Sequence, residues 1–202
     1  MSGIAFSGTL AARKLSRKAP LAWQLKNKLR WAYISGWLGH ILAKPLSKIT
    51  GLAVLQGELS IVHTSGNPGR RTDYGVVSRH LVTTAFVNYM VDNMQAETSA
   101  WGDFKYHDSG VGTTGAAVGD TDIETTDGVA RATGTQTEGA SANIYKSVGT
   151  ITYDSTKAIT EHGLFSSAAS TTLMDRHVFA AINVVATDSI EFTFQLTATA
   201  GG

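Results

Sequence analysis

The chain contains no cysteine, which excludes disulfide frameworks, thiolate metal sites and cysteine nucleophiles. Charged residues are also scarce, at 16% of 202 residues, against the usual quarter or so in globular domains. Small uncharged residues take their place, and a hydrophobic share of 43% is enough for a sizeable core. No apolar run reaches the roughly 18–20 residues of a membrane span, so we expect no membrane partner. Such a weakly charged chain is suited to packing against copies of itself or against partners.

Acidic residues are absent from residues 1–57, although this segment carries nine of the seventeen Lys and Arg residues. All sixteen Asp and Glu residues lie in 58–202, together with the other eight basic residues. The net charge of +1 therefore conceals a basic arm joined to an acidic body. We predict an N-terminal arm over 1–56 with an amphipathic helix, and a body over 57–202.

Within the arm, Pro20 is placed to open a helix, and apolar residues then recur on one stripe of the helical wheel. Three of the four Trp residues lie in the same segment. The pattern fits a helix whose aromatic residues pack on the body, and it also fits a helix that docks on another chain. A helix on a membrane surface and a transit peptide over 1–19 are further alternatives. The stripe consists of Leu21, Leu25, Leu29 and Ala32.

The body shows the alternation of β-strands. Residues 189–197 alternate apolar and polar side chains with a period of two. Further candidate strands are separated by Gly, Asp and Ser clusters at the spacing of sandwiches and barrels. Residues 79–95 instead repeat with a helical period. We predict a mainly β fold, an antiparallel β-sandwich of jelly-roll type, with one packed helix over about 79–95 and a partly helical basic arm. The other strands are expected at 57–64, 104–107, 129–138, 143–153, 158–165 and 172–182.

Three motifs carry the residue types of known sites. A G-x-G-x-x-G motif at 110–115 is not followed by the helix that a dinucleotide site needs, so we interpret it as an inter-strand loop. Residues 107–109, His-Asp-Ser, have the residue types of a triad, but neighbours on an extended chain point to opposite faces. Four carboxylates within 120–127 lack the Gly and distal Glu of a calcium loop. We expect a solvated acidic loop there, with a cation site as the alternative.

The remaining polar residues of the body predict structural pairs. Its histidines are isolated or wrongly spaced for a zinc pair. We expect Glu161, His162, Asp175 and Arg176 to make cross-strand polar pairs at strand ends. No nucleotide, metal or nucleophile pattern remains, so we expect no cofactor and no enzymatic activity.

The order of motifs over residues 76–202 resembles that of small virion proteins of tailed bacteriophages. In this sequence the motifs read T-E-x-G-L-F at 160–165, L-x-x-R-x-x-F at 173–179 and D-S-I-x-F-x-F at 188–194. They are preceded by FKYHDSG at 104–110 and by the segment 132–153. The resemblance implies a β-sandwich structural protein of the particle, in the head or in the tail. The arm lies outside this resemblance.

The arm distinguishes between these locations. A cement protein stabilises the head by holding neighbouring capsid subunits together, and a long arm does so through many modest contacts. We therefore expect a capsid decoration protein on the virion surface that binds the major capsid protein. The alternative is a tail or fibre component that binds a host receptor or glycan. We also expect a homo-oligomer, with a trimer favoured over a dimer.

The charge and aromatic content of the arm predict the kind of contact. Packaged DNA competes with capsid protein for the basic residues, but Trp residues among the charges favour an interface with an apolar centre. The residues expected at the capsid contact are Arg13, Lys14, Arg17, Lys18, Trp23, Lys26, Lys28, Arg30, Trp31 and Trp37.

Overall fold

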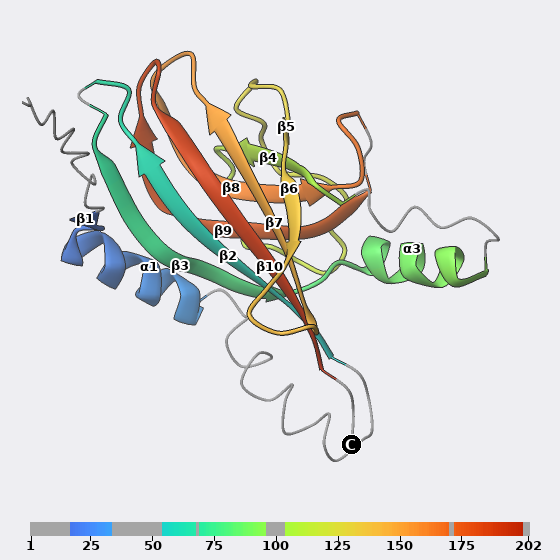
Figure 1. Cartoon of the computed structure of the whole chain (residues 1–202). Helices are drawn as coiled ribbons and strands as arrows, with labels where there is room; N and C mark the ends of the chain where they lie inside the picture. Colours follow the sequence, from blue (N-terminus) through green and yellow to red (C-terminus); the bar gives the residue numbers. More distant parts are fainter. Residues whose placement is uncertain (1–16, 34–53, 68, 96–103, 170–171, 200–202) are drawn as a thin grey trace, which may run out of the picture.

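The computed structural model describes residues 17–33, 54–67, 69–95, 104–169 and 172–199. These parts of the chain are mainly β, with two sheets and two helices (Figure 1). The helices are α1 (Leu21–Tyr33) and α3 (Thr84–Gln95). The strands are β1 (Arg17–Lys18), β2 (Val54–Thr64), β3 (Arg71–Leu81), β4 (Tyr106–Gly110), β5 (Ala132–Thr133), β6 (Thr135–Glu138), β7 (Ile144–Thr152), β8 (Lys157–Phe165), β9 (Leu173–Val184) and β10 (Ser189–Thr199).

The larger sheet has six strands in the order β1-β3-β2-β10-β7-β6. Strand β10 lies at its centre and pairs antiparallel with both β2 and β7. Its large apolar residues are buried, with Phe192 and Phe194 fully inaccessible, while Glu191, Thr193 and Gln195 between them are partly exposed. The expected alternation of this strand is therefore confirmed. Among the described strands, β1 alone runs parallel to its neighbour, β3.

The smaller sheet has the order β5-β4-β8-β9, and its last two strands are buried on both faces. One face contributes to the core that it shares with the six-stranded sheet. On the other face, Phe165 and Leu173 pack against Ile123 from the segment that follows β4. Consecutive residues of β8 and β9 are consequently buried whichever way their side chains point, a pattern expected for strands covered on both sides.

One core joins the two sheets. It contains Ile61 from β2, Phe192 from β10, Ile159 from β8 and Phe179 from β9, all fully buried. Burial of each such side chain stabilises the fold by roughly 1.5–3 kcal/mol. Helix α3 adds Phe86, whose ring meets another core ring edge-on.

The helix expected over 79–95 is shorter, because residues 79–81 belong to β3. In the structure Glu58 pairs with Arg79 in the ladder between β2 and β3. Helix α3 begins only after Thr83, whose hydroxyl accepts a hydrogen bond from the Phe86 N–H at 3.2 Å, a standard N-terminal cap. No strand was expected over the rest of β3, and the expected boundary at residue 57 falls inside β2, which begins at Val54.

Among the described residues, neither helix is both long and apolar enough to span a membrane.

Candidate interaction surface

Helix α1 is attached to the body by one side. The Trp23 indole Nε1 donates to the carbonyl oxygens of Ala180 at 3.2 Å and Ala181 at 3.0 Å, both on β9. The Trp23 ring also meets Tyr74 of β3 edge-on, with 4.5 Å between centroids. The helix therefore covers the place where β9, the edge strand of the four-stranded sheet, meets β3 of the six-stranded sheet.

Asn27, one turn further along α1, completes this attachment. Its Nδ2 donates to the Val77 carbonyl of β3 at 2.8 Å, and its Oδ1 accepts from the Ala180 N–H of β9 at 2.9 Å. Asn27 is buried. These bonds satisfy backbone groups at the strand edges, which would otherwise remain open to pairing with another chain.

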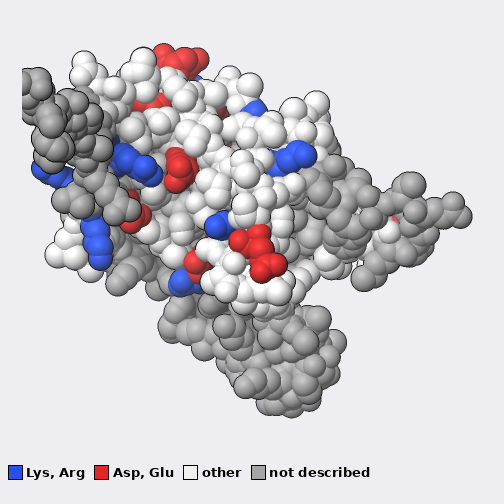
Figure 2. Space-filling view, in the orientation of Figure 1, with Lys and Arg blue, Asp and Glu red and all other residues white. Residues whose placement is uncertain are grey.

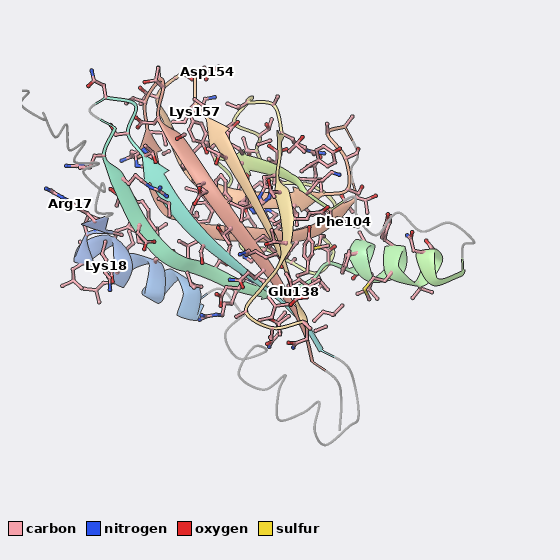
Figure 3. All side chains as sticks on the ribbon, in the orientation of Figure 1. Arg17, Lys18, Phe104, Glu138, Asp154 and Lys157 are labelled. Carbon is pink, nitrogen blue, oxygen red and sulfur yellow. The ribbon has the colours of Figure 1, made fainter. Side chains whose placement is uncertain are left out.

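The other side of α1 is exposed and apolar at its centre. Leu21 is 70% exposed and Leu25 is 53% exposed, and their spacing of four residues places them on one side of the helix. Lys26 beside them is exposed, as are Arg17 and Lys18 of β1. Arg17 and Lys18 form β1, the edge strand of the six-stranded sheet (Figure 3). We call these five residues the arm face.

The arm face differs from the surface of the body near it. Uncharged residues make up most of the described surface that Figure 2 shows. Leu21 is the most exposed large apolar side chain of the described residues, and Leu25 lies one turn from it. Neighbouring exposed apolar residues mark interaction sites more often than isolated ones do.

The residues expected at the capsid contact occupy different positions. Arg17, Lys18 and Lys26 are exposed, whereas Trp23 is half-buried against the chain's own strands. Three others lie in α1, but their side chains are outside the described part. They are Lys28, Arg30 and Trp31. Three more lie outside the described residues altogether: Arg13, Lys14 and Trp37.

The sequence alone left open whether the aromatic residues of α1 pack on the body or the helix docks on another chain. In the structure Trp23 packs on the body, while Leu21 and Leu25 of the apolar stripe lie on the exposed side. The inward positions are taken by Trp23 and Asn27. Because asparagine is polar, a search for apolar periodicity could not find this face. In the sequence, only Trp23 indicated which side of α1 packs on the body.

The acidic segment 120–127 binds the chain's own arginine. Arg176 contacts Asp120 at 3.0 Å, Glu124 at 3.3 Å and Glu161 at 2.8 Å. Glu161 is fully buried, and its carboxylate also accepts hydrogen bonds from the N–H groups of residues 112, 124 and 125. The expected cross-strand pairing of Glu161 with Arg176 is thus present, but in the middle of the strands and not at their ends.

Gly110 and Gly112 leave room for the backbone to lie close to the Glu161 carboxylate. A side-chain Cβ at Gly112 would lie 2.4 Å from the Glu161 Oε1, and one at Gly110 would lie 2.3 Å from the Thr125 carbonyl oxygen. Both distances are too short for real atoms. The G-x-G-x-x-G motif therefore lets the backbone approach Glu161, and no helix follows it.

A second arginine holds the start of the same segment. Arg131 binds Asp108 at 2.8 Å and Asp122 at 3.5 Å, and its guanidinium lies 3.4 Å from the centroid of the Phe165 ring. Burial raises the pKa of Asp108, although the hydrogen bond from Arg131 opposes this effect. An open cavity of about 350 Å³ borders these charges together with Thr126. Within the described residues, no three His, Asp or Glu side chains have the arrangement of a metal site.

The three residues His107, Asp108 and Ser109 point to alternating faces, as expected. The ring of His107 contacts Ser147 at 2.8 Å, Asp108 binds Arg131, and Ser109 meets Tyr153 at 3.1 Å. His107 and Ser147 have the residue types of a base and a nucleophile, but both are fully buried. A substrate therefore has no access to this pair in the closed fold.

No protein family, curated protein or solved structure matches this chain.

Proposed function

We propose that this chain is a structural protein of a tailed-phage virion, a capsid decoration or cement protein that stabilises the head by binding neighbouring capsid subunits. The sequence motifs of residues 76–202 support this proposal through their resemblance to small phage virion proteins. The observation that carries it is the arm face. Exposed Leu21 and Leu25 are held on the surface by an arm whose inner side is bonded to both sheets.

The size of the arm face indicates how it binds. Complete burial of Leu21 and Leu25 would contribute about 1.5–3 kcal/mol each. Exposed ion pairs made by Arg17, Lys18 or Lys26 would add about 0–1 kcal/mol each. The Leu residues therefore supply most of the affinity, and the basic residues direct the face towards an acidic surface.

One arm face alone gives weak binding. Even the upper limits of these contributions are reduced by the cost of association, which is at least about 4 kcal/mol. Several linked copies overcome this deficit, because the second and third contacts form at high effective concentration. We therefore propose a homo-oligomer, with a trimer favoured over a dimer. Sedimentation of the full-length protein tests this part, and a monomer at high concentration would contradict it.

We assign the body to the antiparallel β-sandwich class, of jelly-roll type. The shared core of the two sheets supports the assignment. So does the order of connections, since β7 is followed by β8 in the other sheet and β9 by β10 back in the first, where β10 pairs with β7. An experimental structure of the body tests this assignment.

The location in the particle is tested by immunogold labelling of purified virions with antibodies against the body. We expect gold over the head surface. Gold confined to the tail or its fibres would overturn the decoration role and favour the alternative, a tail component that binds a receptor or glycan. Virions without label would contradict both.

A further inference from the structure

A row of imidazoles crosses the interior between the two sheets. His107 of β4 lies 2.8 Å from the Ser147 hydroxyl of β7 and 2.9 Å from His162 of β8. His162 is the direct cross-strand partner of His177 of β9. The ring of His177 in turn lies 5.5 Å from that of His80, on β3 of the other sheet. We call these four histidines the histidine row.

The row is buried among apolar rings of the six-stranded sheet. His107, His162 and His177 are fully inaccessible, and His80 is 8% exposed. His162 stacks on Phe192 with 4.6 Å between centroids. A charge on any of these imidazoles would therefore be placed between the sheets, out of reach of water.

Few groups in the described part of the chain could balance such a charge. His162 Nδ1 and both ring nitrogens of His177 have no hydrogen-bond partner there. The nearest carboxyl is that of Asp175, whose Oδ2 lies 3.5 Å from His177 Nε2. Asp175 is itself buried, and neither of its oxygens accepts a hydrogen bond. The pair is thus too long and too poorly hydrogen-bonded to compensate the desolvation of two charges.

The remaining titratable groups around the row give no further compensation. Strands β2 and β10 present apolar side chains and Gly57 to it. Tyr145 and Tyr153 stay neutral, because burial raises the pKa of each. Asp127 accepts a hydrogen bond from the Ser109 hydroxyl. Glu161 and Arg176 bind each other and the segment after β4 on the other face of the small sheet.

We propose that the histidine row is an acid-sensitive lock between the two sheets, closed while its imidazoles are neutral and opened when they take up protons. The lock is independent of the proposed virion role, because it depends only on the interior of the body. The protein has two states. In one the histidines are neutral and the sheets are packed together, and in the other the histidines are protonated and the sheets are separated.

The direction of the effect follows from burial. Desolvation lowers the pKa of His107 to about 4, and it lowers the pKa of His162 and His177 well below the ordinary value of 6.5. Below pH 6.5 the unfolded chain therefore binds up to three more protons at these sites than the folded chain does. Burial raises the pKa of Asp175 well above 3.8, so this group binds up to one proton more in the folded chain. The net uptake of these four groups on unfolding approaches two protons.

This proton uptake determines how steeply the folding equilibrium constant depends on pH. Each proton taken up on unfolding changes the folding equilibrium constant by about tenfold per pH unit. We therefore expect the constant to fall by up to about 100-fold per pH unit as the pH decreases from about 6 towards 4.5. Ordinary surface carboxylates titrate near pH 4 and contribute mainly below this window.

The test is urea unfolding of the full-length protein at several pH values between 8 and 4.5. The variant His177→Phe removes one imidazole without removing a hydrogen bond, so the proton uptake should fall from about two to about one. The control is Val91→Ala, an exposed residue of α3 without a titratable side chain, which should keep the wild-type slope. A wild-type constant that is unchanged between pH 7 and 5 would overturn the proposal, as would an unchanged slope in His177→Phe.

A second measurement needs no variant. The ring-proton shifts of the six histidines are followed by NMR in the folded wild-type protein. We expect three imidazoles that show no titration between pH 7 and 5 while the fold persists. If all six titrate near pH 6.5 in the folded state, the interior accepts protons freely and the lock does not exist.

Discussion

Asn27 accepts a hydrogen bond at its Oδ1 from the backbone N–H of Ala180, at 2.9 Å and across 153 positions of the sequence. The same side chain donates to the Val77 carbonyl. One amide therefore connects the arm to both sheets. This connection decides how the arm can be studied, because deleting the arm also removes buried bonds of the body.

We predict that Asn27→Ala destabilises the protein by about 2–4 kcal/mol. The change leaves a buried N–H and a buried carbonyl without partners, and each such group costs about 1–3 kcal/mol. Urea denaturation measures the loss. The neighbouring exposed residue supplies the control, since Lys26→Ala should change stability by no more than about 0.5 kcal/mol. Equal effects of the two changes would show that Asn27 does not hold the arm.

The buried ion pair gives a second prediction. Arg176→Leu should cost about 3–5 kcal/mol, because it leaves the fully buried Glu161 carboxylate without its cation. Thermal or urea unfolding measures this loss. The matched surface pair is Arg71 with Glu191, 3.7 Å apart and about 40% exposed, where Arg71→Leu should cost at most about 1 kcal/mol. If both changes cost the same, the segment after β4 is not held by Arg176.

Strands β7 to β10 could be predicted closely from the sequence, because the turn residues that bound them, and the alternation within β10, are local signals. Strand β3 could not. Its pairing with β2 shifts register twice, and Gly75 has a φ of 64° within it. Each bulge interrupts the period of two, so the apolar residues of β3 no longer alternate along the chain.

Features of the candidate sites could be predicted only where they depend on residues that are close together in the sequence. The basic character of the arm is visible in composition, but which side of α1 faces out depends on Trp23 and Asn27 reaching strands that lie far away in the sequence. Likewise, His107, His162 and His177 lie on three strands, and only the sheet register places them together. The sequence contains the residues of the row but no spacing that joins them.

Gly57 provides a prediction about the interior. A Cβ at this position would lie 1.8 Å from the Asp175 Oδ2, so Gly57→Ala should displace the buried carboxyl and cost about 1–3 kcal/mol or more. At Gly119 a Cβ would meet no atom within 4 Å. Gly119→Ala should therefore be neutral or stabilising by up to about 1 kcal/mol. Urea unfolding compares the two, and a neutral Gly57→Ala would contradict the placement of Asp175.

Asp175 also has a defined pH signature. Burial raises the pKa of this carboxyl well above 3.8, so the folded chain keeps a proton that the unfolded chain releases. This contribution to stability is present below pH 3.8 and is lost as the pH rises through the folded value. Asp175→Asn removes it, so proton uptake on unfolding between pH 6 and 4.5 should rise by about one. A decrease in uptake would show that Asp175 is ionised and pairs with protonated His177.

The arm face is the centre of the functional proposal, and it is tested by binding to phage particles assembled without this protein. The double variant Leu21→Ser with Leu25→Ser changes only exposed residues, so its fold should be retained. Its control is Val87→Ser with Val91→Ser, an exposed pair at the same spacing on α3. Arg17→Ala with Lys18→Ala tests the charges, and should weaken binding mainly at low salt. A steep loss for the charge variant with none for the Leu variant would indicate DNA as the partner.

The deciding measurement is the occupancy of the particles as a function of protein concentration, at physiological salt. We predict that the Leu variant needs at least about tenfold more protein than the wild type for half-occupancy, which corresponds to a loss of 1.4 kcal/mol or more. The Val variant on α3 should match the wild type. Equal half-occupancy for the Leu variant and the wild type would contradict the account, because the arm face would then not be the surface that binds the capsid.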